Sequence, residues 1–400
     1  MMAAIKAAEN GAQVVLLEKM NRVGKKMLIT GKGRCNVTNA AEIPELIKNV
    51  LGNGKFLNSA MRAFDNQDVM QFFESTGVPL KVERGNRVFP VSDKASDIVD
   101  AMVERLHELG VKIFTNTAVS LISLSDGKAI GIETVEGKFF SGDAVILAVG
   151  GASYPGTGSA GDGYTMARTI GHTVTKILPA LVPLETEEDW AREAQGLSLR
   201  NVQVTLFSDG KKESSLFGEM MFTHFGVTGP VILSLSRRVA ELLSEGRFVE
   251  LQINLKPALR VEVLDARVQR DFQKYLRKQI KNALHDLLPN KMIAPVLDLA
   301  YIDPDKAVHE ITQEERRRLI DTICHLNLTV TKTRPLAEAI VTAGGISVKE
   351  INPKTMESKL VSHLYFAGEV VDVDAYTGGY NLQAAFSMGA AAGNWSVWND

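Results

Sequence analysis

The fold class is decided by one stretch of the sequence, residues 18–39, which read EKMNRVGKKMLITGKGRCNVTN. A short apolar run at residues 14–17 precedes it, and Glu18 ends that run. A strand that is buried on both faces and ends in a carboxylate is typical of a dinucleotide-binding sheet at the point where it meets a ribose. Glycines let backbone amides approach a polyanion, and interspersed cations balance its charge. The stretch therefore indicates half of a nucleotide cofactor site; a mobile basic surface loop is the alternative.

The residues before this stretch predict an incomplete βαβ unit. Residues 1–10 are strong helix formers, and Gly11 follows them as a helix-ending residue. In a complete unit, an acidic residue such as Glu18 lies about 20 residues after a G-x-G-x-x-G turn. Counting back from Glu18 places that turn at or before Met1. We therefore expect the chain to start inside the first helix, with the opening strand and its phosphate loop missing.

Length, charge and cysteine content narrow the class of protein. A chain of 400 residues predicts two or three domains. The net charge of −2 predicts no nucleic-acid or membrane partner, and no apolar run is long enough to span a bilayer. Cys35 and Cys324 are far apart and form no CxxC, which predicts neither disulfides nor a metal site. These features favour a cytoplasmic protein that acts on a small molecule.

Further glycine-bearing strand ends occur late in the chain. An apolar run at residues 143–149 ends in Gly150-Gly151, and the loop at 150–164 holds six glycines. A second run at 364–367 ends in Gly368-Glu369. The helix predicted at 383–393 opens on glycines, so its first amides can hold the electron-rich edge of a bound ring. Contacts drawn from both ends of the chain suit FAD better than a contiguous nicotinamide-binding domain.

The middle of the chain has a different character. Residues 177–184, 201–207 and 247–255 alternate like strands, and residues 261–325 are mostly helical with breaks at Pro289 and Pro304. We expect a division into a first part of the FAD domain, a β-rich insert, a helical subdomain, a return through the insert and a second part of the FAD domain, at residues 1–176, 177–256, 257–325, 326–341 and 342–400.

Local patterns predict the elements between residues 56 and 140. Residues 56–77 have a helical apolar face, and residues 81–90 resemble a hairpin around Gly85-Asn86. Gly110 closes a helix that begins at Ser92 or Asp93. The strands expected after it cover residues 111–114, 118–124, 129–135 and 138–140.

The motifs together resemble a known family. The chain is similar to the aminoacetone-oxidase-type FAD-binding flavoproteins, which are NAD(P)/FAD-dependent oxidoreductases, and to members described as bile-acid reducing flavoproteins. The residues that carry the resemblance are the GRCNVTN stretch at 33–39, YPGTGS at 154–159, FTHFG at 222–226, TAGG at 342–345 and TGGYNLQ at 377–383. The resemblance implies an α/β fold: a Rossmann-like two-dinucleotide-binding FAD domain with a β-barrel-like insert and a small helical domain.

The resemblance also implies roles for individual residues. Glu18 would bind the adenosine ribose, Glu369 a ribityl hydroxyl, and residues 379–382 the flavin ring. The full set expected to line FAD is Glu18, Lys19, Gly24, Lys25, Thr30, Gly31, Gly33, Arg34, Cys35, Asn36, Val119, Ala148, Gly150, Gly151, Asp162, Gly368, Glu369, Gly379, Tyr380, Asn381 and Leu382. Within it, Lys25 and Arg34 would face pyrophosphate or ribityl oxygens. Cys35 is open to two interpretations, a redox partner of the flavin or a packing residue.

The implied activity is hydride or electron transfer between flavin and a small organic substrate. His224 and Tyr376 are the candidates for proton transfer on the substrate side, although an aromatic-flanked histidine is also typical of a structural loop residue. NAD(P)H as electron donor is left open, because no second G-x-G-x-x-G marks a separate nicotinamide domain. The oligomeric state is open too.

Two alternatives to that activity remain. One is a fumarate-reductase-type flavoprotein, suggested by Gly-Asp-Gly at 161–163. The other is a non-catalytic protein that kept the fold and lost the cofactor with its first loop.

Overall fold

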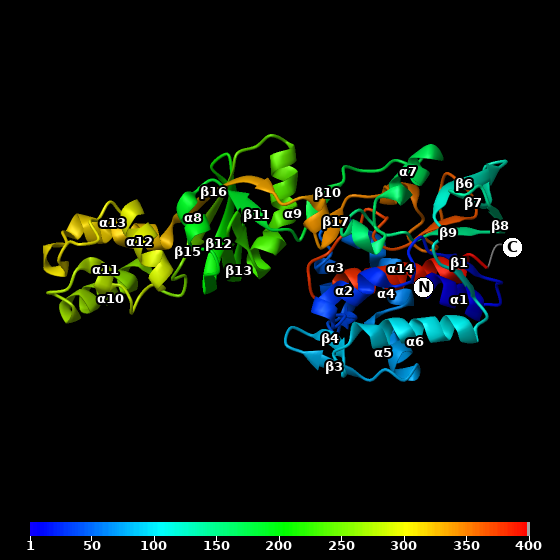
Figure 1. Cartoon of the computed structure of the whole chain (residues 1–400), viewed down its shortest axis with the longest axis horizontal. Helices are drawn as coiled ribbons and strands as arrows, with labels where there is room; N and C mark the ends of the chain where they lie inside the picture. Colours follow the sequence, from blue (N-terminus) through cyan, green and yellow to red (C-terminus); the bar gives the residue numbers. More distant parts are fainter. Residues whose placement is uncertain (398–400) are drawn as a thin grey trace. The chain divides into compact units, whose positions relative to one another are not determined.

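A computed structural model describes residues 1–397 of the chain (Figure 1). The chain forms two compact units. The first comprises residues 1–180 and the chain from Leu336 onward, and the second comprises residues 181–335. Each unit has its own apolar core: one cluster lies wholly within residues 184–330, and two others lie in the first unit.

The first unit contains two pairs of parallel strands. β1 (Val15–Leu17) pairs with β5 (Lys112–Phe114), and β9 (Val145–Leu147) pairs with β18 (Leu364–Phe366). Parallel strands require long crossover connections, and here residues 18–111 and 148–363 supply them, each with both helices and strands. β18 is fully buried, as predicted. β1 is not: Val15 is 45% exposed, so the expectation of a strand buried on both faces was wrong for the strand that leads to Glu18.

Two helices from opposite ends of the sequence pack together in this unit. They are α1 (Met2–Glu9) and α14 (Tyr380–Trp395), drawn in blue and red in Figure 1. A Cβ on Gly393 would lie 2.3 Å from the carbonyl oxygen of Ala3, so only glycine permits this approach of the two backbones. The packing places the C-terminal half of α14 beside the helix that begins the chain.

Residues 56–77 form separate helices rather than the single helix predicted. η2 (Gly54–Leu57) leads into α4 (Asn58–Ala63), and α5 (Asn66–Ser75) begins anew after Asp65. The Asp65 carboxylate accepts hydrogen bonds from the N–H groups of Gln67 and Asp68, forming a capping box. The apolar periodicity continues through this cap, which is why the sequence pattern conceals the break.

The remaining elements of the first unit follow the predicted pattern closely. The expected hairpin exists and joins β2 in a three-stranded sheet of order β2-β4-β3, while β6, β7 and β8 form an antiparallel meander. The elements are α2 (Lys25–Ile29), η1 (Thr30–Gly33), β2 (Thr38–Asn39), α3 (Ile43–Lys48), β3 (Leu80–Glu83), β4 (Arg87–Pro90), α6 (Ala95–Glu108), β6 (Val119–Ser125), β7 (Lys128–Thr134), β8 (Phe139–Ser141), η3 (Pro155–Thr157), α7 (Asp162–Thr169), β10 (Leu178–Ala180), η5 (Leu336–Glu338), β17 (Val341–Ala343) and η6 (Val348–Glu350).

The second unit is built on a closed barrel of strand order β11-β14-β13-β12-β15-β16, which confirms the barrel-like insert. Alternate residues of its strands, such as Val204 and Leu206, are fully buried. The polar start of β13, KKESS, hides its alternation from sequence inspection. The elements are β11 (Leu184–Thr186), α8 (Asp189–Glu193), β12 (Ser198–Ser208), β13 (Lys211–Thr223), β14 (Gly226–Thr228), α9 (Pro230–Ser244), β15 (Val249–Asn254) and β16 (Leu326–Thr333).

A helical subdomain lies between β15 and β16, and the predicted breaks fall where the helices end. Pro289 immediately precedes α12, whereas Pro295 lies inside it. The elements are α10 (Val261–Lys274), α11 (Ile280–Ala283), α12 (Asn290–Leu299), η4 (Val308–Glu310) and α13 (Gln313–Cys324). Among residues 1–397, no helix has the length and apolarity needed to cross a bilayer.

Candidate functional site

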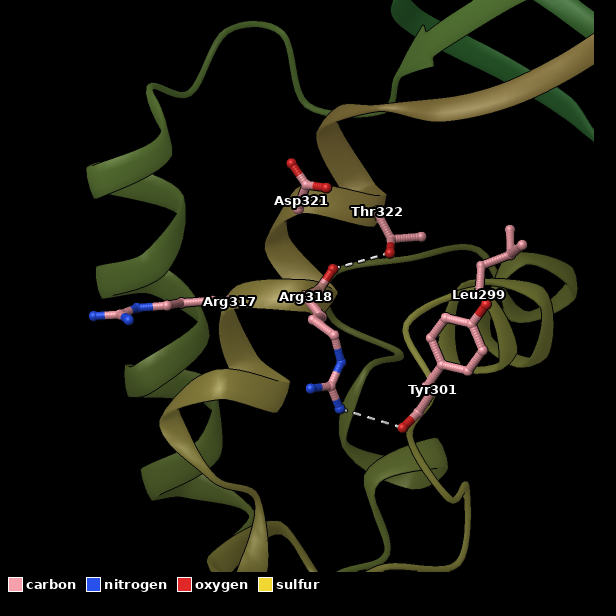
Figure 2. A pocket seen from close by; sticks show the side chains of 6 residues that line it. All are labelled: Leu299, Tyr301, Arg317, Arg318, Asp321 and Thr322. Atoms are coloured by element: carbon pink, nitrogen blue, oxygen red, sulfur yellow. Dashed lines mark hydrogen bonds between the residues drawn. The ribbon is translucent and has the colours of Figure 1, made fainter.

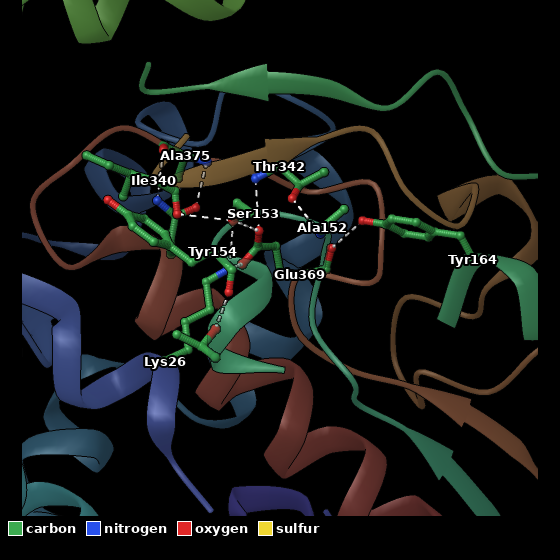
Figure 3. A network of polar contacts seen from close by, with 11 residues as sticks. Lys26, Ala152, Ser153, Tyr154, Tyr164, Ile340, Thr342, Glu369 and Ala375 are labelled. Carbon is green, nitrogen blue, oxygen red and sulfur yellow. Dashed lines mark hydrogen bonds and ion pairs between the residues drawn. The ribbon is translucent and has the colours of Figure 1, made fainter. Parts of the chain in front are cut away.

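The centre of the candidate site is an ion pair between Lys26 and Glu369 (Figure 3). Lys26 lies on α2, and Glu369 follows β18. The ammonium nitrogen of Lys26 lies 2.5 Å from Oε2 of Glu369 and 2.8 Å from Oγ of Ser153. Oε1 of Glu369 accepts hydrogen bonds from the Ser153 hydroxyl at 3.1 Å and from the Thr342 N–H at 2.8 Å. Segments far apart in the sequence therefore converge on one carboxylate.

The paired glycines after β9 allow this convergence. A Cβ on Gly151 would lie 2.6 Å from Oε1 of Glu369 and 2.5 Å from the hydroxyl of Thr342. The same hydroxyl accepts the N–H of Ala152 at 2.9 Å. Tyr164 lies to the side of this cluster with its hydroxyl directed toward it (Figure 3), and burial, followed by the charge of Glu369, raises its pKa. Gly151 thus brings the backbone into contact with the polar cluster, and Tyr164 stays a neutral phenol.

A second group of predicted residues meets at the end of β1. The Glu18 amide donates to the carbonyl of Phe114, and its Oε1 accepts the N–H of Met20 at 2.8 Å. Lys19 forms an ion pair with Asp162 at the start of α7. A Cβ on Gly158 would lie 3.6 Å from Oε1 of Glu18. The loop at 150–164 therefore lies against the strand end that carries the acidic residue.

The two most specific motifs, GRCNVTN and TGGYNLQ, pack on each other. A Cβ on Gly379 would lie 2.2 Å from the carbonyl oxygen of Thr38. The Thr38 hydroxyl donates to the side chain of Gln383 at 2.5 Å, and the Asn39 side chain donates to the carbonyl of Gly378 at 3.0 Å. These contacts anchor the start of α14, where Tyr380, Asn381 and Leu382 lie, against the early glycine loop.

Asn381 has a local role in the structure. Its side chain accepts the N–H of Ala375 at 2.9 Å and donates to the carbonyls of Ala375 and Tyr376 at 2.8 and 3.2 Å. It therefore fixes the loop that precedes α14. Leu382 is half-buried and packs against an apolar cluster of the first unit.

The loop from Thr30 to Asn36 has the open backbone expected near a ligand. Gly31 and Lys32 have left-handed φ values of 56° and 60°, and the Thr30 hydroxyl donates to the carbonyl of Met27. Gly33 has a φ of 83°, and a Cβ there would meet nothing within 4 Å. Oδ1 of Asn36 is buried and has no hydrogen-bond partner within residues 1–397. A bound group or an ordered water can satisfy such a buried acceptor.

Arg34 is engaged by other side chains. Its guanidinium pairs with Glu83 and with Asp93 at 2.6 Å, and lies 4.1 Å above the ring of Phe89. Hydrogen bonds to Arg34 lower the pKa of Glu83, and those to Lys81 and Arg34 lower that of Asp93. A role on pyrophosphate would require Arg34 to leave this cluster.

Cys35 is buried and has a left-handed φ of 57°. Burial raises the pKa of its thiol to about 11, so it is a neutral thiol at physiological pH. Since the thiolate is the reactive form, this environment favours the packing interpretation over the redox one.

The other predicted cofactor residues lie on or next to β6, β9, β18 and α2. Val119 begins β6 opposite Thr134, and Ala148 is the first residue after β9. Gly24 caps α2 with a φ of 75°, and Lys25 is half-buried on the first turn of that helix. Gly150 and Gly368 follow the parallel strands β9 and β18, with φ values of 77° and 80°.

Sequence reasoning missed Lys26, Ser153 and Thr342, which hold Glu369. Lys26 follows the predicted Lys25, and Thr342 opens the TAGG motif. A signal was therefore present for both, in the second lysine of Gly-Lys-Lys and in the residue two positions before a glycine pair.

The two proton-transfer candidates lie in different units. His224 belongs to the second unit, where it is exposed in the turn between β13 and β14 with its ring 4.9 Å from that of Phe225. Tyr376 belongs to the first unit, where it is partly buried and its N–H donates to the carbonyl of Asn49 at 3.0 Å. Tyr376 is also part of the loop that Asn381 fixes.

The helical subdomain holds a separate hollow of about 440 Å³ (Figure 2). The Arg318 guanidinium donates to the carbonyls of Ala300 at 2.9 Å and Tyr301 at 3.4 Å. The Arg317 side chain extends away from these two residues (Figure 2). Leu299, Asp321 and Thr322 complete the lining. This lining supplies no convergent set of free polar groups. Within residues 1–397, no group of three or more His, Cys, Asp or Glu side chains could hold a metal ion.

The residues of the first unit fit FAD. The unpaired Oδ1 of Asn36 offers an acceptor, and the open glycines leave the backbone accessible. Glu18 and Glu369 follow β1 and β18, at the strand ends where dinucleotide-binding folds place the carboxylates that bind cofactor hydroxyls. Lysines at positions 19, 25, 26 and 32 supply positive charge nearby in the sequence.

The chain was compared with known proteins. A family model described as the HI0933-like protein Rossmann domain matches residues 1–395. A 3-dehydro-bile acid delta(4,6)-reductase from Clostridium scindens is 33% identical over 98% of this chain and 95% of that protein. A ribosomal RNA dihydrouridine synthase from Haemophilus influenzae is 30% identical over 97% of this chain and 93% of that protein.

Solved structures share the fold at low identity. A 3-ketosteroid delta1-dehydrogenase from Sterolibacterium denitrificans superposes with a TM-score of 0.52 at 12% identity, covering 99% of this chain and 97% of that chain. A quinol-fumarate reductase superposes with a TM-score of 0.51 at 16% identity, covering 99% and 68%. These similarities show a shared fold and carry no information on the cofactor or the substrate.

Proposed function

Because this chain belongs to the HI0933-like Rossmann-domain family of FAD-dependent oxidoreductases, we propose that it reduces a carbon–carbon double bond conjugated with a carbonyl group. Family membership and the residues that fit FAD set aside the non-catalytic alternative. The likeness to a fumarate reductase is one of fold and supports no particular substrate.

The observation that carries the proposal is the chemistry shared by two relatives with unlike substrates. A delta(4,6)-reductase of a 3-dehydro bile acid saturates a double bond in conjugation with a ketone. A dihydrouridine synthase saturates the carbon–carbon double bond of uracil, which is conjugated with a ring carbonyl. A conjugated carbonyl makes the distant carbon electrophilic, so both bonds accept a hydride there and a proton on the adjacent carbon.

Residues of the first unit would hold the cofactor. We assign Glu18 to the adenosine ribose and Glu369 to a ribityl hydroxyl, with the start of α14 and the Asn36 side chain at the ring. Lys26 holds the Glu369 carboxylate from one side, and the Thr342 N–H holds it from the other. When bound and reduced by NAD(P)H, the flavin would supply the hydride and return to its oxidised form.

The chain must then supply a proton and hold the substrate carbonyl. Tyr376 is the stronger proton donor candidate of this unit, because the Asn381 side chain fixes the loop that bears it. His224, exposed on the barrel turn, is the second candidate. We further propose NAD(P)H as the reductant and a cytoplasmic location, in keeping with the scarcity of cysteine.

Two substrate classes follow from the proposal: a small enone, and a uracil base in ribosomal RNA. The overall charge of −2 favours the small molecule. RNA is favoured by the two relatives named as ribosomal RNA dihydrouridine synthases. It is also favoured by the concentration of basic residues at 270–281.

The test is anaerobic turnover. FAD-loaded protein is reduced with NADH or NADPH and mixed with either a 3-oxo-4,6-diene steroid or protein-free ribosomal RNA. Recovery of oxidised-flavin absorbance, together with a product heavier by two hydrogens, supports the proposal and identifies the substrate class. Reoxidation by fumarate alone would contradict it. The Tyr376→Phe and His224→Ala variants then identify the proton donor, since loss of the donor slows product formation by about 10²-fold or more and leaves FAD affinity unchanged.

A further inference from the structure

The helical subdomain carries a concentrated basic stretch, residues 270–281, which read RDFQKYLRKQIK and which we call the basic segment. It holds five basic side chains and one acidic side chain, in a chain whose net charge is −2. It covers the last turn of α10, the connection that follows, and the start of α11. The local charge is thus opposite in sign to that of the whole protein.

Part of this charge is balanced by neighbouring carboxylates. Lys274 pairs with Asp286 at 2.7 Å, and Lys281 pairs with Asp305. The remaining basic side chains of the segment, Arg270, Arg277 and Lys278, are exposed and form no ion pair within residues 1–397. Three exposed cations therefore lie within nine residues of the sequence, at the end of α10 and in the connection that follows it.

An aromatic ring lies among these cations. The Lys274 and Lys278 ammonium nitrogens lie 4.7 and 4.6 Å from the centre of the Tyr275 ring. The Tyr275 hydroxyl donates to Asp286 at 2.6 Å, which fixes the ring. Next to it, Leu276 is 44% exposed. Basic side chains held beside an aromatic ring are a combination that proteins use to follow a phosphate backbone.

We propose that the basic segment binds the phosphate backbone of RNA. The inference rests on the proposed function and adds to it the surface that would hold a polynucleotide substrate. Charge complementarity carries it: exposed cations at 270, 277 and 278, which form no ion pair within residues 1–397, suit a polyanion. A small uncharged enone would need no such surface.

The test is direct RNA binding by the full-length holoprotein. The probe is fluorescently labelled, protein-free ribosomal RNA transcribed in vitro, with anisotropy recorded between 50 and 400 mM KCl. Each lost phosphate contact removes about 0.7 to 0.9 from the slope of log affinity against log salt. The variant Arg270→Gln/Arg277→Gln/Lys278→Gln should therefore bind at least about 30-fold more weakly at 100 mM KCl, with a slope shallower by about 2.

The matched control is Arg200→Gln/Lys211→Gln/Lys212→Gln. It removes the same charge from exposed basic residues of the barrel strands β12 and β13. This control should bind RNA within about threefold of wild type. Equal thermal unfolding midpoints for both variants show that neither change acts through misfolding.

Three outcomes would overturn the inference: no RNA binding by the wild type, equal weakening in both variants, or binding of phosphatidylglycerol vesicles in place of RNA. The proposed function is tested separately, by measuring whether the steroid enone reoxidises the reduced flavin. Enone reduction without RNA binding would refute this surface and leave the reductase. RNA binding lost only in the 270/277/278 variant, without reduction of either substrate, would establish the surface and refute the reductase.

Discussion

At the scale of single residues, the Lys26–Glu369 ion pair reports most directly on the cofactor site. The side chains are 25% and 18% exposed, so the pair is partly shielded from water. Glu369→Gln keeps the shape and leaves Lys26 facing a neutral amide. We expect FAD affinity to fall about tenfold or more, since charged hydrogen bonds contribute about 1.5 to 3 kcal/mol. Flavin fluorescence during FAD titration measures this.

The matched control is Glu83→Gln, which removes a carboxylate from the Arg34 cluster. If the assignments are right, it should change FAD affinity by less than about threefold, because Glu83 is not assigned to the cofactor and its pair with Arg34 is partly open to solvent. Equal affinity of the wild type and the Glu369→Gln variant would remove Glu369 from the cofactor site.

The Cys35 thiol gives a prediction about pH. Burial raises its pKa to about 11, so the thiolate is scarce below that value in the folded protein. At pH 8, iodoacetamide should label Cys35 about 100-fold more slowly in the folded protein than in urea-unfolded protein. Burial limits access of the reagent, and the raised pKa lowers the fraction of thiolate. Mass spectrometry of tryptic peptides measures both rates. Rapid labelling of the folded protein would show that Cys35 is reactive and reopen its redox role.

Individual contacts of the site were harder to predict from sequence than its location. Glu18, Asp162 and Glu369 are strand-end or turn residues, and the pattern around each is local. The sequence around Lys25 and Lys26 does not reveal which of the two contacts Glu369. Neighbouring helical residues point about 100° apart, so the answer depends on how α2 packs against the rest of the unit. Arg34 pairs with Glu83 only because β3 and β4 fold back beside it, which no spacing near Arg34 reveals.

At the scale of elements, the contact between the GRCNVTN and TGGYNLQ motifs determines where α14 begins. Gly379 has a φ of 97°, and a Cβ there would lie 2.2 Å from the carbonyl oxygen of Thr38. Gly379→Ala combines backbone strain with a steric clash. We expect a loss of about 3 kcal/mol or more in the free energy of unfolding, since strain alone accounts for about 1 to 2 kcal/mol. Urea denaturation measures it.

Gly171→Ala separates the two causes. Gly171 has a similar φ of 91°, but a Cβ there would meet nothing within 4 Å. The Gly171→Ala variant should lose only about 1 to 2 kcal/mol in the free energy of unfolding, the amount expected from backbone strain alone. If both variants lost the same stability, the close approach of the two motifs would be excluded as an energetic determinant.

Elements with local signals were predicted well, and elements defined by distant partners were not. The hairpin β3–β4 follows from Gly85-Asn86, and the helices of residues 261–325 follow from their periodicity. The 13-residue strand β13 begins with a polar run, and pairing with β12 and β14 defines it. The exposure of β1 likewise depends on what packs beside it, which its own apolar residues do not reveal.

At the scale of the whole molecule, the insert has the properties of an independent folding unit. One apolar core lies entirely within residues 184–330, and the N–H of Arg334 donates to the carbonyl of Pro183 at 2.9 Å, so the two ends meet. We expect residues 181–335 alone to unfold cooperatively in urea, with strand and helix signals in circular dichroism. A gradual, non-cooperative loss of signal would contradict this.

The complementary deletion tests where FAD binds. In the first unit, β10 and β17 pair with Ala180 opposite Val341, so a short Gly-Ser linker can replace residues 181–335. We expect this shortened protein to bind FAD within about tenfold of the full chain, because the assigned cofactor residues all lie outside the deletion. Loss of FAD from a folded, shortened protein would place part of the cofactor site in the insert.

The central claim is that the cofactor held by the first unit reduces a conjugated double bond. The most direct measurement is anaerobic mixing of the pre-reduced FAD-loaded protein with an acceptor, while flavin absorbance and product mass are followed together. The account predicts reoxidation by the steroid enone or by ribosomal RNA, one product per flavin, each heavier by two hydrogens. A flavin that stays reduced with both acceptors, or a protein that binds no FAD, would contradict it.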